Sequence, residues 1–481
     1  MGAVRVLPDL PFGWRWESLG DVASWSSGGT PKSRTPRYYG GHIPWAVIGD
    51  LNDGVVTHTV GTITSAGLAA SSAKVVPAGT VLVAMYGSIG KLGIAGTEMA
   101  TNQAIACARP ISSVDPKYLF YWLLGQRLTL LAAGKGGTQA NISQSILKPW
   151  PIPVPPLEEQ RRIVAILDDH LSRLDAADAI LQKSSVRLRG LGEAIMRSEL
   201  LGTTNVGERH SPELSAVGTN DGVLADLPPG WRWTRLGELA DVVGGVTKDS
   251  KRQSDPSFVE VPYLRVANVQ RGRLDLSKIS TIRVPPARAA ALLLLPGDVL
   301  LNEGGDRDKL GRGWVWDGQI PDCIHQNHVF RARVIDDSIV PRLLSWAANV
   351  IGGPWCESNG IQSVNLASIS LKKIRLMPVP VPPVELQPAI AAKIADRLAG
   401  IEHLHRDLDA ALNRSKALRR SLLEEAFSGR LTGAAAEPDS DVESAATEAS
   451  SAYPPISQAY SAAIAAAPSS PTPTPEDASH D

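Results

Sequence analysis

An internal duplication constrains this chain more than any other feature of its sequence. The opening Leu10–Gly20 recurs as Leu227–Gly237, and both copies read Leu-Pro-x-Gly-Trp-Arg-Trp. Further motifs repeat in the same order, while the offset between the copies grows only from 217 to 227 residues. These pairs are Ile43-Pro-Trp with Val261-Pro-Tyr, Lys91-Leu-Gly with Lys309-Leu-Gly, Asn102-Gln-Ala-Ile with Gln326-Asn-His-Val, and Pro153-Val-Pro-Pro with Pro380-Val-Pro-Pro. Because order and spacing are kept throughout, the sequence predicts two copies of one fold.

Each copy begins with a globular part rich in Gly and Pro. Short β-branched runs, such as Thr80–Val83 and Asp298–Leu301, predict short strands between turns. A helix is expected at Pro116–Leu131 and its counterpart at Pro341–Ile351. The predicted fold class is therefore α+β, with two β-rich domains in tandem, each followed by a long helix.

The hydrophobic period changes after a proline cluster that ends each globular part. From Gln160 to Ile195, and again from Gln387 to Leu422, mostly apolar residues recur at alternating spacings of three and four. Five such heptads predict a coiled-coil helix of about 60 Å at 1.5 Å per residue. The seam is expected to include a polar position, His170 in one helix and Arg397 in the other, that fixes the alignment.

The two seams have equal length, so we expect the helices to pair with each other as an antiparallel coiled coil. The alternative is that each helix packs on its own domain or on another chain. The predicted organisation runs in six segments: a first globular domain 8–156, a helix 157–201, a polar linker 202–223, a second globular domain 224–383, a helix 384–432 and a tail 433–481. The tail is rich in Ala, Pro and Ser and is expected to be disordered.

Charge and composition indicate a globular protein of the cytoplasm. The 48 basic and 49 acidic residues give a net charge of −1, but residues 433–481 hold eight acidic residues and no Lys or Arg. The rest of the chain is therefore positive, by about +7, which permits nucleic-acid binding without demonstrating it. Three scattered cysteines without a CxxC pair indicate a reducing compartment. No apolar run reaches the roughly 18 residues of a membrane span, and no signal peptide is recognisable.

Motifs of catalysis and metal binding are incomplete in this sequence. Gly87–Lys91 lacks both the upstream glycine and the Ser or Thr of a phosphate-binding loop. Asp249–Lys251 matches a fragment of a nuclease motif, but the first copy has Thr-Pro-Lys there. Cys323, His325 and His328 have no fourth ligand and no equivalents in the first copy, so a zinc site is not expected. The sequence therefore predicts a binding protein rather than an enzyme, although a site of unrecognised type in the globular parts stays open.

Polar residues of the predicted loops are the candidates for contact with nucleic acid. Asn and Gln can make two hydrogen bonds to an adenine edge, and Lys and Arg bind guanine edges or phosphates. Such residues are also ordinary turn formers, so we expect about half of the set to face DNA. The candidates are Lys32, Ser88, Lys91, Asn102, Gln103, Lys135, Gln139, Asn141, Lys248, Arg307, Lys309, Gln326, Asn327, Gln362 and Asn365. The repeated tryptophans, Trp14, Trp16, Trp231 and Trp233, are expected to pack in the core rather than stack on bases.

In these motifs the sequence resembles the specificity subunits of type I restriction–modification systems. The resemblance covers nearly all of residues 8–432. It is carried by the Leu-Pro-x-Gly-Trp openings, the Gly87–Lys91 turn, the Asn-Gln-Ala-Ile strand, the exit Pro151–Gln160 and the ending Leu423–Leu431. The second copy departs from the pattern at Pro383–Gln387 and has Glu303-Gly-Gly-Asp-Arg-Asp in place of the Gly-Ser-Ile-Gly turn. We therefore expect its reading loop to differ from that of the first copy.

The resemblance implies a non-catalytic subunit that binds a bipartite, asymmetric DNA target, one half per recognition domain. It also implies two methyltransferase subunits bound along the helices, restriction subunits in the larger complex, and helices that set the separation of the half-sites. S-adenosylmethionine, ATP and magnesium are expected on those partners, and no cofactor on this chain. Two alternatives stay open: the recognition chain of a related defence or stand-alone methyltransferase complex, and a coiled-coil scaffold that binds proteins.

Overall fold

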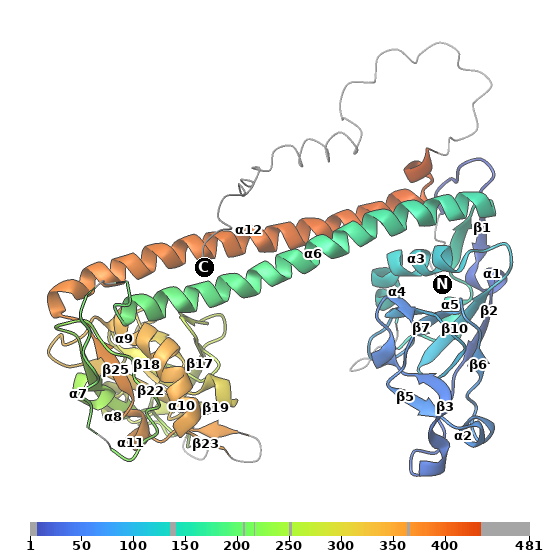
Figure 1. The fold of residues 1–481 in the computed structure, drawn as a ribbon. Helices are drawn as coiled ribbons and strands as arrows, with labels where there is room; N and C mark the ends of the chain where they lie inside the picture. The colour runs from blue at the N-terminus through green and yellow to red at the C-terminus, as the bar shows by residue number, and fades with distance from the viewer. Residues whose placement is uncertain are drawn as a thin grey trace, which may run out of the picture. The chain divides into compact units, whose positions relative to one another are not determined.

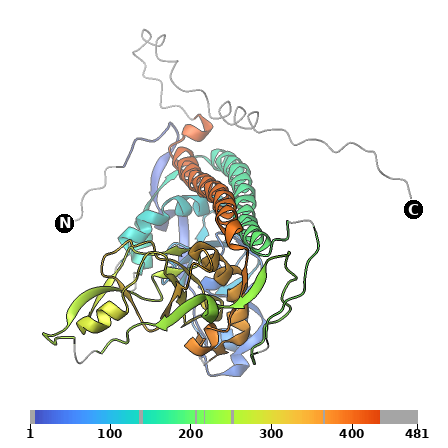
Figure 2. The same ribbon diagram turned by 90° about the vertical axis from the view of Figure 1, so that its left-hand side faces the viewer.

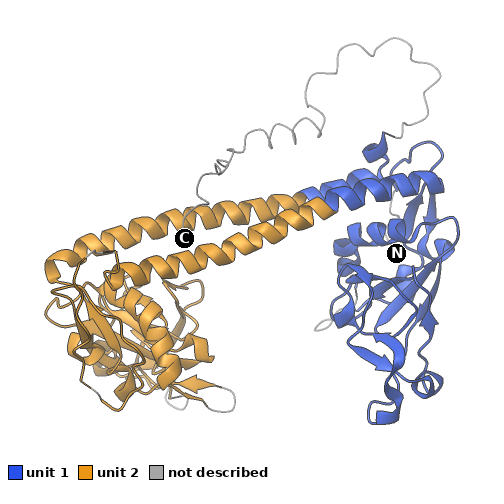
Figure 3. Ribbon diagram, viewed as in Figure 1, with its two compact units in different colours: residues 1–171, 418–481 blue, residues 172–417 orange. Residues whose placement is uncertain are grey.

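The chain folds into two compact units. The computed structural model describes residues 7–134, 141–204, 207–215, 217–249, 253–362 and 366–433. Unit 1 comprises Met1–Leu171 and Leu418–Asp481, and unit 2 comprises Ser172–Ala417 (Figure 3). Each unit therefore combines one globular domain with the start of one long helix and the end of the other. Within the described residues, no helix is both long and apolar enough to span a bilayer.

A five-stranded sheet forms the centre of unit 1, in the order β2-β10-β7-β8-β4. Three of its strands, β2, β10 and β7, are labelled in Figure 1. The central strands are buried on both faces, because Val81–Ala84 and Leu92–Ala95 carry only apolar residues and Gly. β10 pairs antiparallel with β2 on one side and with β7 on the other. The five strands are β2 (Ala23–Ser27), β4 (Gly54–Val56), β7 (Val81–Ala84), β8 (Leu92–Ala95) and β10 (Ile105–Pro110).

A second, four-stranded sheet of unit 1 has the order β5-β3-β9-β6. Its strands are β3 (Tyr39–Ala46), β5 (Gly61–Ile63), β6 (Val75–Val76) and β9 (Met99–Thr101). Short helices complete the domain: α1 (Leu19–Val22), α2 (Ser65–Ala69), α3 (Pro116–Gly125), α4 (Arg127–Ala133), α5 (Gln144–Leu147) and the 3₁₀ turns Pro36–Tyr38 and Ile48–Asp50. Asp115 caps α3 by accepting hydrogen bonds from the backbone N–H groups of Lys117 and Tyr118. The helix expected at Pro116–Leu131 is thus two helices, which meet at Gln126.

Unit 2 repeats this plan with a four-stranded sheet, β13-β22-β18-β20, and a three-stranded sheet, β17-β14-β21. These strands are β13 (Ala240–Gly244), β14 (Val259–Leu264), β17 (Ser280–Val284), β18 (Val299–Asn302), β20 (Gly313–Val315), β21 (Ile324–His325) and β22 (Val329–Val334). Smaller pairs are β15 (Val269–Gln270) with β16 (Arg273–Leu274), and β24 (Ala367–Ser368) with β19 (Gly304–Gly305) and β23 (Ile361–Gln362). The helices are α7 (Leu236–Leu239), α8 (Pro286–Ala291), α9 (Pro341–Ala347), α10 (Gly353–Asn359), α11 (Leu371–Ile374) and a π-helical turn, Ala348–Gly352.

The first and last strands of each domain are neighbours. β1 (Arg15–Ser18) pairs with β11 (Pro151–Val154), and β12 (Arg232–Arg235) pairs with β25 (Pro378–Val381). The repeated tryptophans lie at these strands. Trp14, Trp231 and Trp233 are at most 9% exposed, and the half-buried Trp16 packs on Trp122 with ring centroids 6.3 Å apart. The expectation that these residues are structural is confirmed.

A buried glutamine ties each long helix to its domain. Near the start of α6 (Leu157–Leu200), the Gln160 amide accepts a hydrogen bond from Asp115 N and donates to the Ser113 and Pro155 carbonyls. At the start of α12 (Gln387–Phe427), the Gln387 amide makes the equivalent bonds to residues 340, 338 and 382. These two residues were expected to begin the coiled-coil seam, and their side chains instead fasten the helices to the loops before α3 and α9.

The two long helices lie side by side and run antiparallel, as predicted. Both views show the pairing (Figures 1 and 2). In unit 2, His405 Nδ1 lies 3.5 Å from Ser185 Oγ, and Glu199 lies 2.9 Å from Lys393 Nζ. The partner numbers fall along α12 as they rise along α6, which is the antiparallel order. In unit 1 the same order holds, since Thr432 donates to the Glu159 carboxylate beyond the end of α12.

The polar seam position is not as predicted. His170 is exposed, and its neighbour Leu171 is buried at 7% exposure instead. Arg397 is also exposed, with 44% of its side chain accessible, and donates to Glu199 from the edge of the pair. From Leu167, a step of four residues reaches Leu171 and a further step of three reaches Leu174, so the buried face stays apolar and leaves His170 outside it.

The segment between the two copies packs against unit 2. Asp221 accepts two hydrogen bonds from Arg235, at 2.8 and 3.0 Å, and one from the Trp355 indole at 2.8 Å. The backbone of Asn220 is bonded in both directions by the Asn359 amide. Burial opposes ionisation of Asp221, but the hydrogen bonds and the charge of Arg235 outweigh it and lower the pKa of Asp221. The predicted linker is therefore fastened to the second domain.

Candidate nucleic-acid interface

One end of the central sheet of unit 1 gathers most of its predicted site residues. The strand register places Ser27 opposite Ala106 and Ala84 opposite Ile105. The segment after β2, the turn β7–β8 and the turn β9–β10 therefore lie at the same sheet end. A fourth segment joins them, because Tyr86 forms an isolated β-bridge with Asn141. Four loops that are far apart in the sequence thus form one surface.

Unit 2 builds the same surface from the equivalent segments. Gly244 lies opposite Phe330 and Asn302 opposite Val329, so the corresponding loops meet at the corresponding sheet end. The Tyr86–Asn141 bridge has its counterpart in Gly304 paired with Ser368. We call these the reading ends of the two units. The flanks of the reading loops thus match between the copies, although Arg307–Lys309 adds a 3₁₀ turn at the tip in unit 2.

The candidates of unit 1 differ in how firmly they are held. The Asn102 amide accepts from Ala104 N, and the Gln103 amide oxygen accepts from the Thr30 hydroxyl. Lys91 is half-buried, and its Nζ lies 3.4 Å from the Ile48 carbonyl oxygen. Lys32, Ser88 and Asn141 are exposed. Lys91 therefore has a structural contact, whereas Gln103 has an exposed side chain whose orientation is fixed.

The candidates of unit 2 include two cations with partners inside the protein. Arg307 donates to the Glu357 carbonyl oxygen at 3.0 and 3.1 Å, and Lys309 forms an ion pair with Asp306. The hydrogen bond and charge of Lys309 lower the pKa of Asp306. Lys248 and Gln362 are exposed, and Gln326 and Asn327 are half-buried in the turn before β22. Lys135, Gln139 and Asn365 lie outside the described residues.

Sequence analysis missed several polar side chains of the reading ends. The exposed Tyr86 precedes the Gly87–Lys91 turn, and Gln144 donates to Ser27 across unit 1 at 2.6 Å. In unit 2, His328 Nδ1 lies 2.6 Å from the Glu303 carboxylate. Comparison of the two copies could have indicated this pair, because the polar Glu303 and His328 align with Met85 and Ala104 of unit 1.

The buried residues near the unit 2 reading end do not form a metal site. Cys323 and His325 are at most 1% exposed, and burial raises the pKa of Cys323 to about 12. His325 Nδ1 bonds the Val329 carbonyl at 2.6 Å. Among the described residues, no three His, Cys, Asp or Glu side chains gather closely enough to bind an ion.

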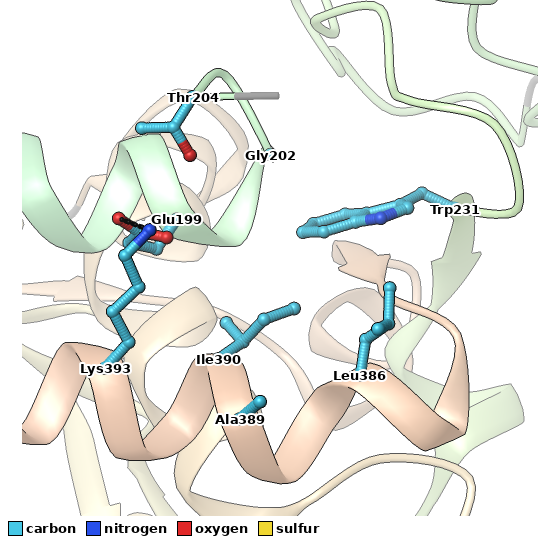
Figure 4. Close-up of a pocket in the computed structure, with 8 residues that line it drawn as sticks. All are labelled: Glu199, Gly202, Thr204, Trp231, Leu386, Ala389, Ile390 and Lys393. Carbon is cyan, nitrogen blue, oxygen red and sulfur yellow. Dashed lines mark ion pairs between the residues drawn. The ribbon is translucent and has the colours of Figure 1, made fainter. Parts of the chain in front are cut away.

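The small cavity drawn in Figure 4 lies away from the reading ends, between the end of α6 and the start of α12 in unit 2. It has a volume of about 200 Å³, and the Trp231 ring covers Leu386 and Ile390 on one side. At its other end Glu199, whose side chain is 5% exposed, pairs with Lys393. None of the predicted site residues lines this cavity. It separates the two helices where they meet the domain.

Comparisons with known proteins find similarity in the first domain and, in the longer matches, over most of the chain. The family model described as the type I restriction modification DNA specificity domain matches residues 11–183. The MjaIX specificity subunit of Methanocaldococcus jannaschii is 26% identical over 271 residues, which are 55% of this chain and 60% of the relative. The match thus spans about three fifths of that relative. The StySPI specificity subunit of Salmonella potsdam is 23% identical over 437 residues, covering 88% of this chain and 90% of the relative.

A solved structure supports the same fold. It comes from work on complex assembly and conformational transition of the type I R-M system, has a TM-score of 0.66 and is 22% identical. The similarity covers 88% of this chain and all of the other. The order of domain, helix, domain, helix is therefore common to both. With its matching domain and its relatives, the chain is similar over most of its length to the specificity subunits of type I restriction–modification systems.

Proposed function

We propose that this chain is the DNA-recognition subunit of a type I restriction–modification complex. The observation that carries the proposal is the pair of reading ends, which share one backbone framework and differ in their side chains. Gln103 and Asn327, for example, occupy equivalent turns and are held by different partners. Two equivalent scaffolds with different polar surfaces suit a bipartite target whose halves differ in sequence.

The chemistry of the reading ends suits the DNA major groove. Amide side chains such as Gln103 and Asn327 bind base edges, and exposed cations such as Lys32 and Lys248 bind phosphates. A phosphate contact releases counterions, so affinity should fall steeply as salt is added. Base edges supply specificity, and phosphates fix the register of each domain on the duplex.

Catalysis and cofactors belong, in this proposal, to other subunits. The chain directs methyltransferase subunits, which use S-adenosylmethionine, and restriction subunits, which use ATP and magnesium. The long helices α6 and α12 are the proposed binding place for two methyltransferase subunits. The residues of the reading ends supply recognition alone, and the complex acts on DNA in the cytoplasm.

A domain exchange tests the proposal. The full chain and a variant whose residues 10–156 come from the S. potsdam relative would each select binders from random duplexes at one fixed salt concentration. We expect two separated half-sites for the parent chain and a change in one half only for the variant. Selection that changes in both halves would contradict modular reading. A parent chain that retains no duplexes and selects no sequence would instead favour a protein-binding scaffold.

A further inference from the structure

The turn before β10 in unit 1 and the turn before β22 in unit 2 make the same backbone hydrogen bonds and carry different side chains. Gly29 N bonds the Thr101 carbonyl at 2.9 Å in unit 1, and Val246 N bonds the His325 carbonyl at 2.9 Å in unit 2. The same turn of unit 1 makes a second backbone contact, because Met85 N bonds the Ala104 carbonyl at 2.8 Å. Its counterpart in unit 2 is Glu303 N bonded to the His328 carbonyl at 3.0 Å. Any difference in reading between these turns must therefore come from the side chains.

In unit 2 the turn carries a chain of three polar side chains. The Glu303 carboxylate lies 2.6 Å from His328 Nδ1, and His328 Nε2 lies 3.4 Å from Asn327 Nδ2. An ionised carboxylate only accepts hydrogen bonds, so it places the proton on Nδ1. In neutral imidazole Nε2 is then an acceptor, and it receives one N–H of the Asn327 amide. The His328 side chain is 54% exposed, so this chain of bonds reaches the surface.

The orientation of the Asn327 amide follows from that chain of bonds. One N–H is directed at His328, which leaves the carbonyl oxygen and the second N–H for a ligand. This outward pattern, one acceptor beside one donor, is complementary to adenine, which offers N6–H and N7 in the major groove. Guanine offers two acceptors there, O6 and N7, and would leave the amide oxygen without a donor.

The corresponding amide of unit 1 is fastened at its other end. The Gln103 oxygen accepts from Thr30, so its NH₂ group is the part left for a ligand. Unit 1 also lacks the carboxylate and the imidazole, because Met85 and Ala104 stand at their places. The Glu303–His328 pair is therefore a device of the second unit alone.

We propose that Glu303 and His328 position Asn327 to read an adenine in the half-site bound by unit 2. The proposal rests on DNA recognition as the proposed function of the chain. Asn327 is the residue that contacts the base, and Glu303 and His328 act through it.

The full chain tests the proposal by selection from random duplexes and by affinity for the selected site with each base at every position. In the parent chain, one position of one half-site should prefer adenine. The double variant Glu303→Met with His328→Ala installs the residues of unit 1 and removes the charge together with the pair. We expect the adenine preference at that position to fall about tenfold or more, with the other positions unchanged. A purely structural role would change affinity for all sequences alike.

Two further variants make the test independent of folding defects. Asn327→Asp keeps the size of the side chain and leaves acceptors only, so the preferred base should change from adenine to cytosine, which offers N4–H. The reciprocal control, Met85→Glu with Ala104→His in unit 1, should leave this position unchanged. Selection of two half-sites with no response to Asn327→Asp would overturn the positioning proposal and leave the proposed function standing. A parent chain that selects no sequence would overturn both.

Discussion

His325 shows how burial sets the chemistry of a single residue. Its side chain is fully buried, its Nδ1 bonds the Val329 carbonyl, and its Nε2 has no partner among the described residues. Burial lowers the pKa of His325 from 6.5 to about 4, against the opposing effect of the Val329 hydrogen bond. Sequence analysis weighed this histidine as a zinc ligand, since neither its burial nor its neighbours can be read from the chain.

The lowered pKa predicts a pH-dependent stability. An unfolded His325 binds a proton below about pH 6.5, whereas the folded one stays neutral down to about pH 4. The contribution to the free energy of unfolding is therefore complete above pH 6.5 and is lost as the pH falls from 6.5 to 4. The loss should reach about 3 kcal/mol.

Urea denaturation at a series of pH values measures this effect. The variant His325→Gln should lose that part of the pH dependence, because the new side chain does not titrate. His42→Gln, at an exposed histidine of unit 1, is the matched control and should behave as the parent chain does. An unchanged pH profile in His325→Gln would show that other groups cause the acid sensitivity.

At the scale of elements, the long helices were readable from the sequence and their packing was not. The spacing of apolar residues predicted both helices, and the equal length of the two seams predicted their antiparallel pairing. The spacing misplaced His170, which is exposed while Leu171 is buried, because a step of three or of four residues after Leu167 fits the alternating pattern equally well. Gln160 and Gln387 fitted the seam by position, and only the folded loops reveal that they bond backbone groups.

Glu199 is the residue whose removal should weaken the helix pair most selectively. Its side chain is 5% exposed and accepts from Lys393 at 2.9 Å and Arg397 at 3.1 Å. In Glu199→Ala the two cations lose their shared partner and remain close together. Because both are almost half exposed, water replaces part of the loss, and we expect a destabilisation of about 1–2 kcal/mol.

Thermal unfolding measures the difference as a fall in Tm of several degrees. Glu193→Ala, at an exposed position of the same helix, should change the stability by less than about 0.5 kcal/mol. Equal effects of the two substitutions would mean that the ion pairs contribute nothing beyond helix propensity.

For the whole molecule, the duplication predicted the architecture. It did not predict which side chains of the reading ends are free to bind a ligand. Order and spacing of motifs predicted two equivalent domains, because a repeated framework needs repeated residues. Side-chain roles at the reading ends depend on loops that meet only after folding, as with Glu303 and His328. Lys309 was a candidate for DNA contact and is paired with Asp306 in the structure. The acidic tail was predicted at 433–481, and all of it after Gly433 lies outside the described residues.

Truncation after Gly433 tests the role of that acidic segment. It carries eight acidic residues and no basic ones, so it repels DNA rather than binding it. We expect the truncated chain to bind its target as tightly as the parent near 0.15 M salt, and somewhat more tightly at low salt, where repulsion is less screened. Affinity measured by titration at both salt concentrations checks this. Loss of binding on truncation would assign the segment a direct part in recognition.

The pairing of first and last strands in each domain has a consequence for inheritance. Arg15 lies opposite Val154, and Arg232 lies opposite Val381, so the chain enters and leaves each domain at one place. Two gene crossovers, one in the first strand of a domain and one in its last strand, would transfer a complete recognition surface between relatives. Both long helices would stay unbroken. New specificities can then spread as single inherited pieces, without the gradual change of one contact at a time.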